Sequence, residues 1–319
     1  FNIFILKLNP SSGVILWQKA LEQVGFGNAG EAITIGNNDN VYIAGQFGRD
    51  EVDFDPDTAA ADTFYVEPLG QQDYFILNLD SNGSFIRHMH MQGTSGSSVA
   101  SPKDIVLSYD QKDIYVTGFY KGGTDFDPDT GSANRGGGYE RVFVHKLDTL
   151  GNHYWVNTAG GSADGRGRSI NLDASGNVYS SGMYTAGGQV QFGFNGTQGG
   201  LVSFAAGTQG IYIQKMDENG RLLWVEGIKD NHVSAYPNMH DGGLAIHHNQ
   251  DVQIGGSFHG AFDFDPGLDT FFISGGSWPG KRDLFTSRLI QCFTTYSTQV
   301  QTACDSFLWM DGNTYYAST

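Results

Sequence analysis

Three acidic elements of this sequence carry carboxylates at every second position, a spacing that can hold a metal ion. They read VDFDPD at 52–57, TDFDPD at 124–129 and FDFDPG at 262–267. On an extended backbone, the carboxylates of one element lie on one side and its Phe on the other. Oxygen donors of this kind, followed by Gly, resemble part of a calcium loop. The predicted calcium ligands are Asp53, Asp55 and Asp57, then Asp125, Asp127 and Asp129, and finally Asp263, Asp265 and Asp269.

A second interpretation of these elements needs no metal. Asp-Pro forms turns in its own right. The Glu that completes an EF-hand at its twelfth position is missing, because Phe64 and Gly136 occupy those places. The elements would then be exposed acidic turns, each anchored by a buried Phe. On either interpretation the element VQFGFN at 190–195, which has no carboxylate, binds no metal.

The histidines lack the spacing of a zinc site. His88 and His90 share one face of a predicted outer strand, where we expect them to be exposed, and His240, His247 and His248 cluster later in the chain. Zinc requires three or four converging ligands, and no such set recurs. The sequence also contains no GxSxG elbow, no HExxH pair and no Walker loop. These absences favour a protein that is not an enzyme.

The acidic elements recur in step with a longer repeat. One strand-like run returns five times, as IFILKL, YFILNL, VFVHKL, IYIQKM and LFTSRL, with starts near 3, 74, 142, 211 and 284. Successive starts are therefore 71, 68, 69 and 73 residues apart. Such regular spacing is typical of tandem structural repeats.

Each repeat also contains hairpin signals. A turn and a strand follow the first four runs, as in DTLGNHYW, and then comes a strand pair with a polar turn, as in AITIGNNDNVYIAG and SINLDASGNVYSSG. Short alternating runs rich in Val, Ile, Phe and Tyr, bounded by Asn, Asp, Ser and Gly, predict β-hairpins. The chain is therefore predicted to be all-β, with four antiparallel strands in each unit of about 70 residues.

A four-stranded unit cannot bury both of its faces alone, whereas radial stacking of copies buries them. Residues 1–290 are therefore predicted to form a β-propeller of at least four blades. The AITIG-type strand would be innermost, followed by VYIAGQF, IFILKL and the strand that carries Trp17. Trp17, Trp155 and Trp224 would pack between neighbouring blades. The ring would either close with four or five blades or continue into further N-terminal blades.

Several of these sequence segments, taken in order, resemble one family of repeats. LDASGNVY, DFDPD, DFDPG and IFILKLN are similar to the β-propeller repeats of bacterial surface and secreted proteins, especially those of Bacteroidota. The resemblance covers residues 1–290. It implies a propeller that is displayed outside the cell, and it implies no single activity.

Residues 291–319 do not continue the repeat pattern. They are predicted to be a linker and the start of a further module. TACDSFLWMDGNTYYAS resembles the beginning of immunoglobulin-like modules in Bacteroidota surface proteins, which implies export through type IX secretion. The two cysteines of the chain, Cys292 and Cys304, lie here and can pair with each other or with other cysteines. The resemblance to exported proteins makes a Cys292–Cys304 disulfide chemically permissible.

Charge and hydropathy exclude two classes of partner. The net charge is −16, from 18 basic and 34 acidic residues, so the surface would repel the phosphates of nucleic acids. No apolar run approaches the ~20 residues needed to span a bilayer as a helix.

Two functions fit the remaining features. The first is a non-enzymatic extracellular scaffold or adhesin that binds a protein, a glycan or other chains of a surface assembly. Its contacts would come from the variable loops near 58–73, 130–141, 196–210 and 268–283. The alternative is a carbohydrate-active propeller, either a lectin or a glycoside hydrolase with paired carboxylates. Tyr120, Tyr184 and Trp278 would then be candidates for stacking on sugar rings, unless they serve in packing. Calcium is the one cofactor that the sequence suggests.

Overall fold

The structure, a computed structural model, describes most of the chain as β-strands. The described residues are 3–21, 27–57, 63–185, 188–193, 201–204, 209–230, 238–266, 270–275, 282–290, 306–308 and 314–316. Within these ranges there is no helix, and so no helix that is long and apolar enough to cross a membrane. The chain divides into two compact units, Phe1–Leu289 and Ile290–Thr319. In the second unit, β24 (Ser306–Leu308) pairs with β25 (Thr314–Tyr316).

The first unit consists of four small sheets arranged as a four-blade β-propeller, as the repeat predicted. Blade 1 contains β3 (Ala29–Ile35), β4 (Val41–Phe47), β7 (Asp73–Leu79) and β8 (Phe85–Met91). Blade 2 contains β9 (Val99–Leu107), β10 (Asp113–Asp125), β11 (Asn134–Asp148) and β12 (His153–Gly161). Blade 3 contains β13 (Asp164–Leu172), β14 (Val178–Thr185), β17 (Gln209–Met216) and β18 (Leu222–Asp230). Blade 4 contains β19 (Asn238–Ile246), β20 (Val252–His259) and β23 (Asp283–Leu289).

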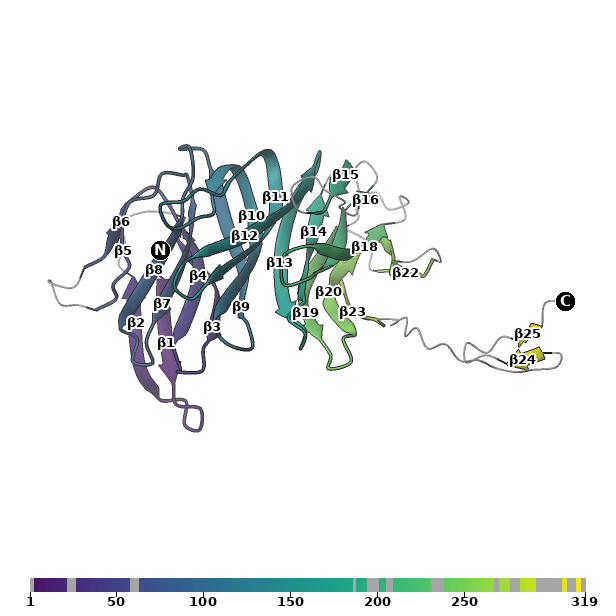
Figure 1. Cartoon of the computed structure of the whole chain (residues 1–319), viewed down its shortest axis with the longest axis horizontal. Helices are drawn as coiled ribbons and strands as arrows, with labels where there is room; N and C mark the ends of the chain where they lie inside the picture. The colour runs from purple at the N-terminus through teal and green to yellow at the C-terminus, as the bar shows by residue number, and fades with distance from the viewer. Residues whose placement is uncertain are drawn as a thin grey trace. The chain divides into compact units, whose positions relative to one another are not determined.

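A separate hairpin, β1 (Ile3–Leu8) and β2 (Ile15–Leu21), precedes blade 1 and packs on it. By sequence these strands correspond to the third and fourth strands of a blade. Figure 1 shows the blades following one another from the purple hairpin to the green blade 4. Within each of blades 1 to 3 the four strands pair in the predicted order, from the AITIG-type strand to the strand equivalent to that of Trp17, and blade 4 shows the first three of these strands.

The turn between the third and fourth strands is built the same way in three blades. In blade 2, Asp148 Oδ1 accepts hydrogen bonds from the backbone N–H of Leu150 (2.9 Å) and of Asn152 (2.8 Å). Gly151 follows with a φ of 97°, a conformation that costs glycine little. Asp80 and Asp217 close the turns of blades 1 and 3 with the same pair of contacts.

Tryptophans join consecutive blades, as predicted. The indole N–H of Trp17 donates to the Ser81 carbonyl (3.0 Å), and that of Trp155 donates to the Glu218 carbonyl (3.1 Å). Each acceptor lies in the turn between the third and fourth strands of the following blade. A side chain on one blade therefore fixes the position of the next.

Every innermost strand contains a β-bulge at the same position. The extra residues are Glu31 in β3, Lys103 in β9, Arg168 in β13 and Gly242 in β19. Opposite the bulge, the second strand of blades 1 to 3 carries Gly45, Gly118 or Gly182. A Cβ at these glycines would lie 2.1–2.3 Å from a backbone oxygen of the innermost strand. The glycine of each YxxG sequence is thus a steric requirement of the bulge.

Candidate functional site

The acidic elements lie in the connections between the second and third strands of the blades. In blade 2, Asp125 Oδ1 accepts hydrogen bonds from the backbone N–H of Asp127 (3.1 Å) and of Ala133 (2.7 Å). Asp127 Oδ1 in turn accepts one from the N–H of Asp129 (3.0 Å). The first two carboxylates of this element therefore hold the loop that contains them.

The other two elements have the same internal bonding. Asp53 Oδ1 accepts from the N–H groups of Asp55 (3.0 Å) and Phe64 (2.8 Å). Asp263 Oδ1 accepts from those of Asp265 (3.1 Å) and Phe271 (2.8 Å). In all three loops the first Asp closes the connection by capping two amides, one nearby and one at its far end.

The Phe between the carboxylates is an anchor. Phe54 and Phe126 are fully buried, and Phe264 is buried in blade 4. Phe126 lies 5.0 Å from the ring of Phe143 and 5.5 Å from that of Tyr120, measured between ring centroids. The blade 3 element keeps this anchor, as Phe192, although it has lost the carboxylates. The repeated feature is therefore the aromatic anchor, and the carboxylates accompany it in three blades.

The connections of blades 2, 3 and 4 also pair with the preceding blade. Asp125 and Gln92 exchange two backbone hydrogen bonds of 2.8 and 3.1 Å. In blade 3, β15 (Gly188–Gln191) pairs with the end of β12, and in blade 4, β21 (Ala261–Asp263) pairs with the end of β18. The acidic elements of blades 2 and 4, and the equivalent element of blade 3, thus form joints between blades. The repeat pattern contains no signal for this pairing, because it is made by backbone groups.

Calcium binding by these loops remains a prediction. No three His, Cys, Asp or Glu side chains of the described residues converge in a metal-binding group. Asp269 lies outside those residues, as do Cys292 and Cys304. The capped amides occupy one oxygen of each leading carboxylate, and these hydrogen bonds favour the interpretation of the loops as turns that need no metal.

We therefore expect chelation to leave the thermal unfolding midpoint unchanged. A ligand that binds the native state alone raises its stability by mass action. The measurement is the Tm at fixed protein concentration in millimolar calcium and then in excess EGTA. A clear fall on chelation that calcium reverses would show that the loops are structural calcium sites.

Two histidines, the half-buried His88 and the fully buried His145, lie beneath the acidic loops. The ring of His88 is 4.0 Å from that of Phe54, and the ring of His145 is 5.5 Å from that of Phe126. Burial, with the nearby charge of His90, lowers the pKa of His88 to about 3. Burial, with His153 beside it, holds the pKa of His145 well below 6.5. The expectation that His88 and His90 are ordinary exposed residues was wrong, because the anchor Phe of the connection folds over their strand.

These histidines predict acid sensitivity. Both resist protonation in the folded state, so the unfolded state binds more protons once the pH falls below about 6.5. Each should lower the free energy of unfolding by up to about 1.4 kcal/mol per pH unit below that value, until its folded pKa is reached. Urea unfolding between pH 7 and pH 4 should show a shallower loss of stability in His88→Phe than in the wild type. Equal slopes would contradict this role for His88.

A cluster of charges joins blades 1, 2 and 3 through their innermost strands and β11. Lys103 Nζ donates to Glu31 Oε1 (2.6 Å), and Arg166 makes a bidentate ion pair with Glu140. The ring of Phe119 lies between the two cations, 5.7 Å from Lys103 Nζ and 4.8 Å from Arg166 Cζ. Since two cations face two carboxylates, the cluster is balanced and holds blades together.

Asp104, a carboxylate of the innermost strand of blade 2, accepts hydrogen bonds from the next blade. Asp104 Oδ2 accepts hydrogen bonds from Ser169 Oγ (3.1 Å) and from the N–H of Ile170 (2.9 Å) in the next blade. Burial raises the pKa of Asp104, and these hydrogen bonds oppose that shift. Asp104 and Ser169 therefore serve as a contact between blades 2 and 3.

The tyrosines considered for sugar stacking are not accessible. Tyr120 and Tyr184 are both 1% exposed and pack in the core beside the anchors Phe126 and Phe192. Trp278 and the side chain of His240 lie outside the described residues. Searches against models of protein families and against curated proteins found no match.

Proposed function

We propose that this protein is a non-enzymatic interaction module that binds a partner through the connections between the second and third strands of its blades. All four connections emerge at the same edge of the blades, because the strands of every blade run in the same order. They comprise residues 48–72, the paired ends of β10 and β11 with their turn (121–141), and residues 186–208 and 260–282, of which 58–62, 186–187, 194–200, 205–208, 267–269 and 276–281 lie outside the described residues. This edge is called the connection face below.

The observation that supports the proposal is the placement of exposed aromatic side chains. Among the described residues eight Phe and Tyr side chains are exposed, and five of them lie on the connection face. These five are Phe64, Tyr65, Tyr139, Phe271 and Phe272. Exposed aromatic side chains are typical of contact surfaces for proteins and for sugar rings.

The opposite edge of the blades has the character of a scaffold, which supports placing the binding site on the connection face. There the turns repeat one Asx-capped construction from blade to blade, which suits a scaffold. The connections instead differ in form: a short β5–β6 pair (Val52–Asp53 with Tyr65–Val66), a long extension of β10 and β11, and hairpins in blades 3 and 4. Variable loops on a constant frame are a common arrangement for recognition.

The alternative is a carbohydrate-active propeller, and the exposed aromatics favour its lectin form. A hydrolase would in addition need two carboxylates that are free to act on the glycosidic bond. The carboxylates described above are bonded to backbone amides or paired with cations. We therefore propose binding without catalysis, by a module displayed outside the cell, in keeping with the resemblance of its repeats to those of surface proteins.

The proposal is tested by binding to arrays of glycans and of purified extracellular proteins. The triple variant Tyr65→Ser, Phe271→Ser, Phe272→Ser should lose at least about tenfold in affinity for whatever the wild type binds. The control is Tyr109→Ser with Tyr154→Ser, which removes two exposed tyrosines from outside the connection face. Equal loss in both variants, or none in the first, would refute the proposal. Product formed from an array glycan would refute the absence of catalysis.

A further inference from the structure

Arg141 stands at a position of the repeat where blade 1 has a structural carboxylate. The residue directly before the first residue of the recurring third-strand run is Asp73 in blade 1, Arg141 in blade 2, Gly210 in blade 3 and Asp283 in blade 4. Asp73 is fully buried and accepts hydrogen bonds from the backbone N–H of Gly70 (3.0 Å) and of Gly93 (2.8 Å). Blade 2 therefore has a cation where blade 1 has a carboxylate that caps the backbone.

Two glycines make room for the side chain of Arg141. A Cβ at Gly137 would lie 2.3 Å from Arg141 Nε, and a Cβ at Gly160 would lie 2.8 Å from Arg141 Cγ. Both distances are shorter than van der Waals contact, so a larger residue at either position would displace the Arg141 side chain. Glycine within a strand often marks such a close approach. The backbone on both sides therefore determines where the guanidinium lies.

The guanidinium of Arg141 has no acceptor among the described residues. The side chain is partly exposed, its Nε is buried, and it forms no hydrogen bond or ion pair with any residue that the structure describes. A buried donor that lacks an acceptor costs free energy. The adjacent carboxylate, Glu140, forms its bidentate ion pair with Arg166 instead. The charge of Arg141 is therefore available to a ligand.

Arg135 adds a second positive charge to the same connection. It donates hydrogen bonds to the backbone carbonyls of Asn134 (2.9 Å) and Val156 (3.4 Å), and within the described ranges it forms no ion pair. Burial raises the pKa of the Tyr120 hydroxyl, and the charges of Arg141 and Arg135 are among the effects that oppose this rise. Both guanidinium groups therefore lie within electrostatic reach of one hydroxyl group.

The surface beside Arg141 is open. The pairing of β10 with β11 is irregular just before Arg141, and residues 138–140 bulge out of β11. A Cβ at Gly138 would have no heavy atom within 4 Å, and Tyr139 is 50% exposed. The β11 bulge, residues 138–140, thus places an exposed aromatic side chain two positions before a guanidinium that has no acceptor.

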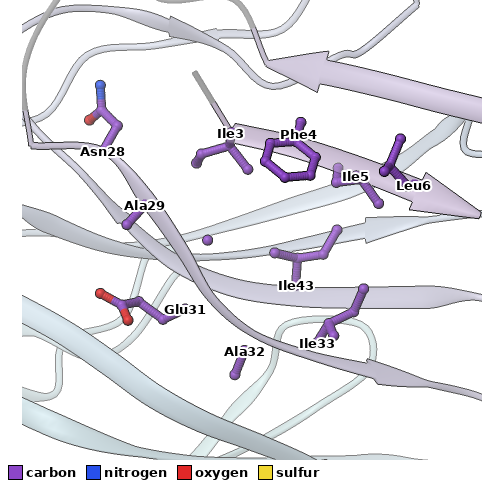
Figure 2. Close-up of a pocket in the computed structure, with 11 residues that line it drawn as sticks. Ile3, Phe4, Ile5, Leu6, Asn28, Ala29, Glu31, Ala32, Ile33 and Ile43 are labelled. Carbon is purple, nitrogen blue, oxygen red and sulfur yellow. The ribbon is translucent and has the colours of Figure 1, made fainter. Parts of the chain in front are cut away.

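A cavity elsewhere in the molecule offers no such charge. Figure 2 shows it between β1 and blade 1, where its lining is mostly aliphatic and includes Ile5, Ile33 and Ile43. The carboxylate that lines it, Glu31, accepts a hydrogen bond of 2.6 Å from Lys103 Nζ. An acidic ligand would therefore meet a cation at the β11 bulge and none in the lining of this cavity.

We propose that the β11 bulge and Arg141 bind the acidic group of a terminal sugar. The planar guanidinium of Arg141 donates two parallel hydrogen bonds to the oxygens of a carboxylate or a sulfate ester, and Arg135 adds to the attraction. The ring of Tyr139 packs against the sugar ring. A ligand with a single acidic group suits a chain of net charge −16, which repels polyanions. This inference rests on the proposed function, because the bulge belongs to the connection face, and it names the class of ligand.

The probes are lactose, 3′-sulfolactose and 3′-sialyllactose, which share a neutral core and differ in their acidic group. Calorimetric titration of the full chain at low ionic strength should show that at least one acidic sugar binds at least about tenfold more tightly than lactose. Whether the sulfate ester or the carboxylate is preferred identifies the acidic group.

Arg141→Gln should abolish the preference for the acidic sugar. Arg221→Gln is the matched control, because it removes the same charge from an exposed arginine in a turn at the opposite edge of the blades, and it should keep the preference. If circular dichroism shows that Arg141→Gln does not fold, the double variant Arg135→Gln, Tyr139→Ser replaces it and should weaken binding of the acidic sugar at least about fivefold.

Absence of a preference for either acidic sugar, or an equal preference in Arg141→Gln and the wild type, would overturn this inference. Tighter binding of the acidic peptide acetyl-Glu-Glu-Glu-amide than of either sugar would also overturn it, because the partner would then be a protein. Failure of the proposed function is recognised separately, from the variant Tyr65→Ser, Phe271→Ser, Phe272→Ser, which leaves the β11 bulge unchanged. If that variant loses its partner while no acidic sugar is preferred, the connection face is retained and the acidic ligand is rejected.

Discussion

Phe126→Ala is expected to lower the free energy of unfolding by about 3–5 kcal/mol, the usual cost of emptying a core aromatic position. Phe126 is fully buried and contacts the rings of Tyr120, Phe143 and His145. Its loss would leave a cavity and would also release the connection that pairs with Gln92 of blade 1. Urea unfolding followed by fluorescence and circular dichroism measures the change.

Tyr139→Ala is the matched control for this prediction, because Tyr139 is an exposed aromatic residue of the same connection. It should change the free energy of unfolding by no more than about 0.5 kcal/mol. Similar losses in the two variants would show that Phe126 is not an anchor.

Gly118→Ala is expected to destabilise the fold by about 3 kcal/mol or to prevent folding, through a steric clash that the backbone cannot relieve cheaply. The added Cβ would lie 2.2 Å from the carbonyl oxygen of Ser101 and 2.7 Å from the Cα of Pro102. Both atoms belong to the innermost strand at its bulge. Either the bulge or the pairing of β9 with β10 must be distorted.

Gly138→Ala provides the comparison, since no heavy atom lies within 4 Å of a Cβ placed there. This variant should be neutral or slightly stabilising, by up to about 1 kcal/mol, because alanine restricts the unfolded chain. The measurement is again the midpoint and slope of urea unfolding. If Gly118→Ala unfolds at the same midpoint as Gly138→Ala, the bulge does not need its glycine.

The strand content and strand order could be predicted from the sequence because they depend on side-chain pattern. The alternation of carboxylates with Phe predicted that Phe54 and Phe126 are buried. The equivalent positions of Trp17 and Trp155 in the repeat predicted that they pack between blades. These features reflect burial of apolar side chains, which a sequence displays directly.

Other features could not be predicted because they depend on backbone groups or on neighbours far away in sequence. The bulge at Lys103 leaves only an indirect signal in Gly118 of the next strand. The pairing of β12 with β15 has no side-chain pattern at all. The inaccessibility of Tyr120 and the partial burial of His88 follow from the connections folding back over the blades, and loop paths are not set by periodicity.

The joints between blades also bear on how the propeller loses its structure. An array of repeats that touch only through side chains can unravel from one end, one repeat at a time. Here hydrogen-bonded backbone from blades 2, 3 and 4 continues into the sheet of the blade before. Opening blade 2, 3 or 4 therefore also breaks backbone hydrogen bonds to the blade before it. We expect this coupling to penalise fraying from an end and to make denaturation a single cooperative transition.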